Sequence, residues 1–248
     1  MKILFKTVLS ATFLLLIGLM VSAKPAQDSF FDKVDLFLKE SVDNQGNVAY
    51  KNLSSDPSSL NELTDMIANY DLSDKSAAEK KAFYTNTYNI LVIKQIVDRF
   101  PIKGPLTVNG FFDKIKNNVA GEELTLNQVE KDKNLYVTKD ERLHFAVVCG
   151  AKGCPPLANF AYTPENIEEQ LDARTKVALN SDYFIRVKKG KVAISQIFQW
   201  YRDDFFKDKN MGGLVGYLNK YRKNQIPAKS KIVYYEYDWN LNSQSDSK

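Results

Sequence analysis

The sequence predicts an α+β fold, in which helices pack on a mostly antiparallel sheet. Residues 76–98 carry the strongest helical pattern, and residues 116–125 and 183–194 each have the pattern of a hairpin around a glycine. Strand and helix patterns do not alternate in the βαβ order that a parallel sheet requires. Helices and hairpins that are segregated in this way are typical of the α+β class.

Helix start and stop signals divide the first part of the chain. Ser76 with Glu79 forms the pattern of a capping box, and Pro101 stops the helix that follows. Asp56 is a good N-cap before Pro57, which is favoured at the first helical position. The predicted elements are a helix over residues 29–42, a short strand near residues 48–50, a helix from residue 57 and a helix over residues 76–98.

The second part mixes both element types. Gly121 predicts the turn of a hairpin, and Thr125 with Gln128 predicts the cap of a short helix. Ser195 predicts the start of the aromatic helix that follows it. The predicted elements are a hairpin over residues 116–125, a short helix carrying Glu130, a buried strand over 143–148, a helix over 163–179, a hairpin joining 183–187 to 191–194, an aromatic helix over 196–201 and a last strand over 232–237.

The first 23 residues have the pattern of a signal peptide. Lys2 and Lys6 precede an apolar run over residues 7–20, and Val21 and Ala23 place small side chains where a signal peptidase reads. The run is shorter than the roughly 20 residues that span a bilayer, so we expect cleavage after Ala23 rather than a retained anchor. The predicted product is secreted or periplasmic, with no membrane span, one globular domain over residues 24–241 and a disordered tail over 242–248.

Charge excludes one class of partner. Cleavage removes Lys2 and Lys6 but no acidic residue, which leaves 32 of the 34 basic side chains against 30 acidic ones. Nucleic-acid binding requires clustered Lys and Arg, and the nearly balanced chain has no such cluster. We expect no nucleic-acid partner, and no motif calls for a cofactor.

The chain's only histidine, His144, and its only cysteines, Cys149 and Cys154, lie within eleven positions. Any histidine or thiol chemistry must therefore occur here. Two interpretations of His144 stay open: a hydrogen-bonded core residue, or a catalytic group, since histidine titrates near neutrality. Glu130 or the acidic and basic cluster over residues 140–142 would then orient it.

Two cysteines in an exported protein favour a disulfide between Cys149 and Cys154. Free structural thiols and a reactive Cys149 are the alternatives. Two sulfurs and one histidine leave a four-ligand zinc shell incomplete, so we expect no metal site.

Asparagines interrupt the apolar stripe of the longest predicted helix. Asn86 and Asn89 fall on the same face as Ala82 and Ile93, so their amides need partners. Either they tie a neighbouring segment to the helix, or they line a cleft beside His144.

Four blocks of sequence, in order, lie at residues 82–91, 144–157, 194–205 and 237–242. Together they resemble the signature blocks of a known family, the domain of unknown function family 547. The resemblance covers most of the chain from about Tyr50 and implies an architecture and a set of site residues, including the histidine, but no reaction.

The chain also resembles transglutaminase-like and papain-like thiol enzymes, in which a helix carries the nucleophile and a later strand opens with the base. Asn86 stands where that comparison would need a cysteine, which predicts an inactive relative. With Cys149 as the nucleophile, the strand after His144 would have to break, because strand alternation puts the two side chains on opposite faces.

Two hypotheses of function follow. The first is an exported domain that binds a peptide or glycan in a cleft lined by Asn86, Asn89 and His144, with Tyr88, Trp200 and Tyr201 as further binding residues. The second is a hydrolase or acyl-transferase in which His144 acts with a thiol or polar partner, Cys149 and Glu130 being the candidates.

Overall fold

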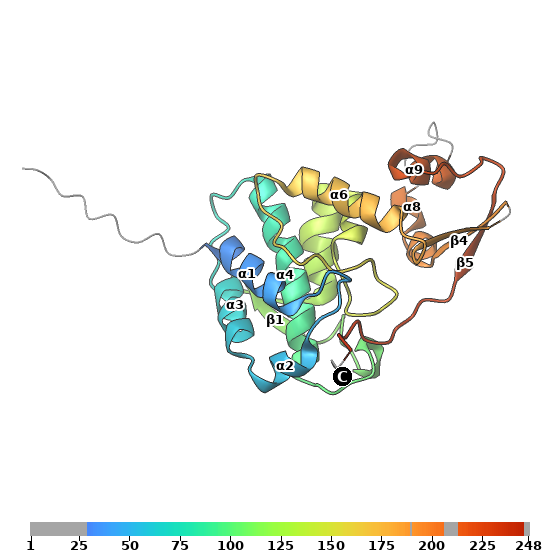
Figure 1. Ribbon diagram of the computed structural model, residues 1–248. Helices are drawn as coiled ribbons and strands as arrows, with labels where there is room; N and C mark the ends of the chain where they lie inside the picture. The colour runs from blue at the N-terminus through green and yellow to red at the C-terminus, as the bar shows by residue number, and fades with distance from the viewer. Residues whose placement is uncertain (1–28, 189, 206–212, 246–248) are drawn as a thin grey trace, which may run out of the picture.

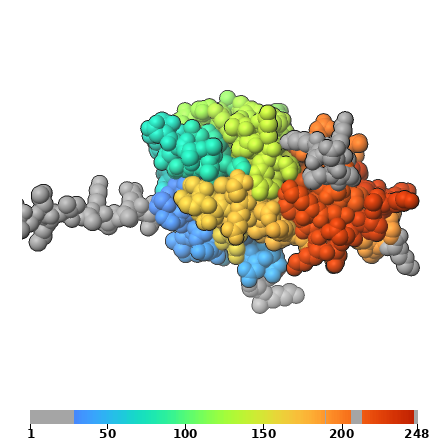
Figure 2. All heavy atoms as spheres, turned by 90° about the horizontal axis from the view of Figure 1, so that it is seen from above, coloured from blue at the N-terminus to red at the C-terminus, as the bar shows by residue number. Residues whose placement is uncertain are grey.

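The computed structural model describes residues 29–188, 190–205 and 213–245, and it confirms the α+β class. The predicted signal peptide at residues 1–23 lies outside the described residues. In Figure 1 helices gather around α4, while the sheet of β4 and β5 lies at the opposite end of the molecule. Figure 2 shows the same arrangement from above, with the N-terminal helices at one end and the region of α9 and β5 at the other.

Helix α4 (Ala77–Val97) is the centre of the core. Ser76 caps it by accepting a hydrogen bond from the Glu79 N–H, as predicted. Fifteen of its 21 residues are buried, so neighbours cover nearly its whole circumference instead of one stripe. Such an enclosed helix needs partners on every side.

Three helices cover one side of α4. They are α1 (Phe30–Ser41), α2 (Tyr50–Ser55) and α3 (Ser58–Ala68). Ser29 and Asp32 cap α1 reciprocally, which confirms the predicted start of this helix. The strand predicted near residues 48–50 is wrong, because Val48 makes only single bridges and Tyr50 already begins α2.

The first predicted hairpin is confirmed as β1 (Lys116–Val119) and β2 (Glu122–Thr125), which pair antiparallel. Gly121 has a φ of +82°, a conformation that glycine adopts without strain. Thr125 and Gln128 then exchange the two hydrogen bonds of a capping box. The helix that this box begins is a π-helix, η2 (Gln128–Leu135), and it carries Glu130.

A three-stranded sheet has the order β3-β4-β5. Strands β3 (Ile185–Lys188) and β4 (Lys191–Ser195) form the predicted antiparallel hairpin. Strand β5 (Lys231–Tyr235) pairs parallel with β4, so the predicted mostly antiparallel arrangement includes one parallel pair. Between β4 and β5 the chain forms helices, so the last strand returns in the same direction as β4. These helices are α7 (Ile197–Trp200), α8 (Arg202–Phe205) and α9 (Gly213–Tyr221).

The buried strand predicted over residues 143–148 is wrong. Its first half is the 3-10 helix η3 (Glu141–Phe145), which Asp140 caps by accepting from the Arg142 N–H. Past η3, the Asn89 amide donates to the Ala146 carbonyl and accepts from the Val148 N–H. One side chain therefore satisfies the backbone groups that a neighbouring strand would have paired.

The remaining elements connect these parts. Helix α6 begins at Ile167, later than the predicted start at residue 163, and ends at Leu179 as expected. The other described elements are η1 (Pro105–Thr107) and α5 (Tyr136–Thr138). None of the helices in the described ranges is both long and apolar enough to cross a membrane.

The predicted disordered tail begins too early. Asn242 is buried, donates to the Gly46 carbonyl and accepts from the Tyr50 hydroxyl. Ser243 forms a parallel bridge with Val48. The end of the described chain is therefore fixed against the loop between α1 and α2, and residues 246–248 lie outside the description.

Candidate functional site

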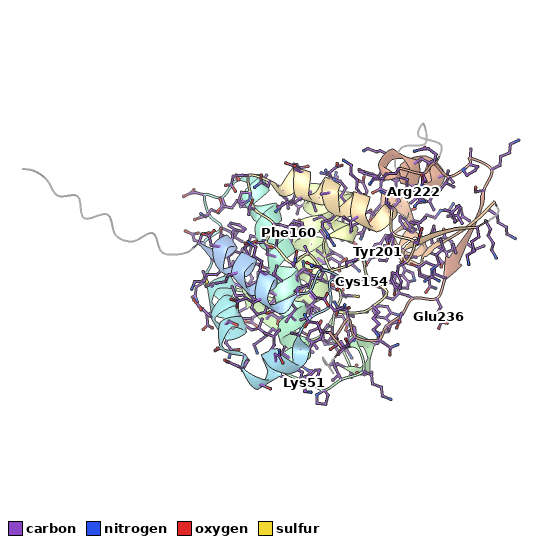
Figure 3. All side chains as sticks on the ribbon, in the orientation of Figure 1. Lys51, Cys154, Phe160, Tyr201, Arg222 and Glu236 are labelled. Atoms are coloured by element: carbon purple, nitrogen blue, oxygen red, sulfur yellow. The ribbon has the colours of Figure 1, made fainter. Side chains whose placement is uncertain are left out.

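A cavity of about 270 Å³ lies at the junction of α4, η2 and η3 with α7 and the segment that follows β5. The labelled Cys154 and Tyr201 in Figure 3 lie in this junction. The cavity brings together His144, both cysteines and most of the other predicted site residues. Its lining consists of Tyr88, Phe112, Asn127, Glu130, His144, Val147, Cys149, Cys154, Ile197, Trp200, Tyr201, Tyr237 and Trp239.

His144 is held by a carboxylate that was not predicted as its partner. Its Nε2 lies 2.9 Å from Asp204 Oδ2, and its ring packs on Tyr201 with centroids 4.1 Å apart. The side chain is almost fully buried but lines the cavity. With Asp204 ionised, Nε2 donates its proton to the carboxylate, and Nδ1 becomes the acceptor nitrogen of the neutral ring.

The next residue along the chain positions each member of this pair. Phe145 follows His144, Phe205 follows Asp204, and the two buried rings pack with centroids 5.8 Å apart. The packing of Phe145 on Phe205 therefore fixes the pairing of His144 with Asp204. Asp204 lies in the third block that resembles the family, and this position was the available sequence signal.

The cluster over residues 140–142, proposed as an alternative partner of His144, has a different role. Asp140 accepts from Lys81 at 2.7 Å and from Arg142, and Glu168 also pairs with both cations. Burial opposes ionisation of Asp140, but the hydrogen bonds from Arg142 and Lys81 outweigh it and lower the pKa of Asp140 to about 2. These ion pairs join α4, η3 and α6. They thereby fix the position of η3, the helix that carries His144.

Glu130 lies in the cavity wall and is buried. The Tyr201 hydroxyl donates a long hydrogen bond of 3.4 Å to its Oε1. Burial raises the pKa of Glu130 above its ordinary value, and the nearby His144 offsets part of that rise. A π-helix supplies this side chain, a local geometry that is frequent at functional sites.

The two cysteines line the cavity as thiols in contact, with Sγ atoms 2.7 Å apart. The predicted disulfide is not present in this structure and stays a prediction. Cys154 Sγ accepts from the Cys149 N–H at 3.1 Å and from the Tyr237 hydroxyl at 2.9 Å. Gly153 permits this approach, because a Cβ there would lie 2.7 Å from the Tyr237 ring.

These contacts separate the two thiols chemically. Burial alone would raise the pKa of Cys154, but hydrogen bonds from Cys149 and Tyr237 outweigh it and lower that pKa below its ordinary value. The hydrogen bond to Cys154, followed by burial, raises the pKa of Cys149. Of the pair, Cys154 is thus the sulfur whose thiolate form the site favours, whereas the sequence singled out Cys149.

Asn86 and Asn89 do not line the cavity, so the predicted cleft lined by them is corrected. Both are buried in α4. Asn86 donates to the Tyr162 carbonyl and accepts from the Tyr162 N–H, as Asn89 does for the segment after His144. Each amide ties an irregular segment to the central helix. This is the first of the two roles that the sequence left open for these asparagines.

Aromatic rings form one side of the cavity. The predicted binding residues Tyr88, Trp200 and Tyr201 all contribute to the lining, together with Tyr237 and Trp239, which sequence analysis did not single out. The last two come from the segment after β5. Their position in a block that resembles the family was the available signal.

His, Cys, Asp and Glu form no group of three or more that could hold a metal ion in the described part of the chain. The chemical groups that converge are a histidine with its carboxylate, a buried acid, two thiols and an aromatic wall. They offer proton transfer, nucleophilic sulfur and stacking in one place.

Fold and site together define an α+β protein with an aromatic pocket around a His–Asp pair. Residues 72–177 match the model of a family described as a protein of unknown function, DUF547. This stretch contains α4, His144 and both cysteines, and the match supports the family that the sequence blocks resemble. Trp200, Asp204 and the segment after β5 lie beyond the matched stretch. No curated protein and no solved structure matches the chain.

Proposed function

We propose that the cavity binds a neutral glycan. The aromatic wall carries this proposal: Trp200 and Trp239 stack with an interplanar angle of 27°, and Tyr237 packs 4.7 Å from Trp239. Trp200 remains 47% exposed, so part of its surface is available to a ligand. Aromatic faces are broad apolar surfaces, and the C–H face of a sugar ring packs well on them.

The polar lining suits hydroxyl groups. Asn127, Glu130 and His144 add hydrogen-bond donors and acceptors to the same lining. Burial raises the pKa of Glu130 above its ordinary value. Its carboxyl oxygens accept hydrogen bonds, and a protonated carboxyl would also donate one. A few polar groups in a mainly apolar pocket are the usual arrangement for orienting a small ligand.

Charge favours a glycan over a peptide. The described residues that line the cavity include no Lys or Arg, so a peptide's terminal carboxylate would find no cation there. Burying an unpaired carboxylate is costly, which disfavours anionic ligands generally. The signal peptide predicted over residues 1–23 extends the proposal to an exported protein that meets its glycan outside the cytoplasm.

The chain's two tryptophans both line the cavity, so tryptophan emission, excited selectively over the tyrosines, reports on this site alone. Titration with neutral oligosaccharides and uncharged peptidoglycan fragments is expected to change the emission and to saturate. Trp200→Ala should weaken binding at least about tenfold, equivalent to roughly 1.4 kcal/mol, because an exposed stacking surface is lost. Trp239 still reports in this variant.

Tyr234→Ala is the matched control, since Tyr234 is an exposed aromatic residue on β5 outside the cavity lining. It should bind like the parent. Equal affinities for parent and Trp200→Ala would refute the aromatic site. A response to peptides of similar size, with none to glycans, would favour the peptide hypothesis instead.

The His144–Asp204 hydrogen bond supports a second candidate, a hydrolase or acyl-transferase. In such an enzyme the histidine takes the thiol's proton, the thiolate attacks an acyl carbonyl to form a thioester, and the histidine returns the proton to the leaving group. Water or an acceptor then attacks the thioester, which releases the acyl product and regenerates the thiol. A carboxylate that orients the histidine belongs to this chemistry. Cys154 is the thiol whose charge the site stabilises, so it replaces Cys149 as the candidate nucleophile.

This candidate predicts that iodoacetamide labels Cys154 in the reduced, folded protein at neutral pH. His144→Ala and Asp204→Asn should each slow labelling and turnover of an activated acyl ester by about tenfold or more, because general-base assistance is lost. Peptide mapping identifies the labelled thiol. Labelling at the rate of an unfolded thiol, unaffected by either substitution, would exclude the candidate.

A further inference from the structure

We propose that Cys149 and Cys154 form a thiol–disulfide exchange pair that reacts with small-molecule disulfides entering through the cavity. The inference does not depend on glycan binding. It rests on two sulfurs in contact, on hydrogen bonds that distinguish them, and on a loop that holds them together.

The loop between the cysteines is fixed by the segment after β5. The N–H groups of Lys152 and Gly153 donate to the carbonyls of Asn240 and Asp238, each at 2.8 Å. Gly150 has a φ of +80°, and a Cβ there would lie 2.5 Å from Ile96 of α4. Backbone hydrogen bonds and close packing therefore hold the two Sγ atoms 2.7 Å apart. The loop does not have to change conformation for the sulfurs to meet.

Hydrogen bonds assign different roles to the two sulfurs. Cys154 Sγ accepts from the Cys149 N–H and from the Tyr237 hydroxyl, and it lies against the Cys149 thiol. Donors of this kind stabilise a thiolate, which is the attacking species in exchange. The lowered pKa of Cys154 and the raised pKa of Cys149 agree with an attacking and a resolving thiol.

The reaction balances without another cofactor. The Cys154 thiolate attacks one sulfur of a disulfide RSSR, forms a mixed disulfide and releases RS⁻, which takes up a proton. Cys149 then loses its proton to solvent, attacks Cys154 Sγ and releases the second RS⁻. The pair is oxidised by two electrons, and RSSR is reduced to two RSH.

The full chain is tested with glutathione as the probe. Reduced protein is incubated with mixtures of reduced and oxidised glutathione, quenched with acid and alkylated, and its mass is measured. The expected product is one internal disulfide whose fraction follows the glutathione ratio reversibly, with no lasting adduct. The chain contains no other cysteine, so the assignment is unambiguous.

Single variants identify the attacking sulfur. In Cys149→Ser a glutathione adduct should accumulate on Cys154, because the resolving thiol is missing. The adduct on Cys149 in Cys154→Ser should form at least about tenfold more slowly, the factor that one pKa unit of thiolate population gives. Tyr237→Phe keeps the ring, removes one donor and should slow adduct formation on Cys154.

Three results would overturn the proposal. They are equal adduct rates in the two serine variants, a wild-type pair that stays reduced at every glutathione ratio, and a disulfide that glutathione reduces only after unfolding. The last result would identify a static structural crosslink. If a serine variant fails to fold, peptide mapping of wild-type protein quenched early in the reaction still locates the first adduct.

Discussion

Phe145→Ala is expected to lower the free energy of unfolding by about 3–5 kcal/mol, the usual cost of removing a buried aromatic ring. Phe145 is fully buried, and its ring packs against Phe184, Phe198 and Phe205 with centroids 5.8 to 6.1 Å apart. These partners come from three segments around the sheet. The alanine would leave a cavity where η3 meets the β3–β5 part of the fold.

The same substitution should loosen the His144–Asp204 pair, because the packing of Phe145 on Phe205 positions both side chains. Urea unfolding measures the stability, and Phe145→Leu should retain part of what alanine loses. Tyr136→Ala serves as the control, since Tyr136 is 61% exposed. A surface change of this kind usually alters stability by less than about 0.5 kcal/mol. A loss below about 1 kcal/mol for Phe145→Ala would mean that the packing of Phe145 on its three phenylalanine partners does not join η3 to the β3–β5 part of the fold.

Asn86→Leu is expected to destabilise by roughly 1–3 kcal/mol for each backbone group that it leaves unpaired. Asn86 is fully buried, and its amide holds both the N–H and the carbonyl of Tyr162. Leucine fits a helix well but offers neither a donor nor an acceptor. Two polar groups would then be buried without partners, so the total loss should exceed that of a single hydrogen bond.

Thermal and urea unfolding of Asn86→Leu are compared with those of Asn61→Leu. Asn61 is an exposed residue within α3, so the control introduces the same side chain into a helix without orphaning buried groups. It should be about as stable as the parent. An Asn86→Leu variant of parental stability would show that water replaces the amide at Tyr162, and that the segment does not depend on α4.

Local signals were sufficient wherever an element is determined by its own residues. Ser76 and Glu79 predicted the start of α4, and Gly121 predicted the first hairpin, because caps and turns depend on residues a few positions apart. The apolar run after His144 has the pattern of a strand. It forms η3 and a loop because Asn89, far away in sequence, pairs with its backbone.

In the candidate site, too, residue type was sufficient for some residues, whereas contacts that depend on the fold were missed. His144, Glu130, the cysteines and three aromatic residues were predicted from residue type, and the cavity brings them together. Asp204 was missed as the partner of His144 because 60 positions separate them and their contact depends on tertiary packing. Tyr237 was missed for the same reason, since only the folded chain brings its hydroxyl to Cys154.

The position of Tyr237, Trp239 and Asn242 sets the order in which this site is assembled during synthesis. A chain emerging from the ribosome would complete α4, η3 and both cysteines long before residues 237–242 became available to cover them. Until then Cys154 would lack the Tyr237 hydroxyl, and the loops at Gly46 and Gly153 would lack their partners. The pocket is therefore complete only when the last described segment docks, and before that a nascent chain would have accessible thiols.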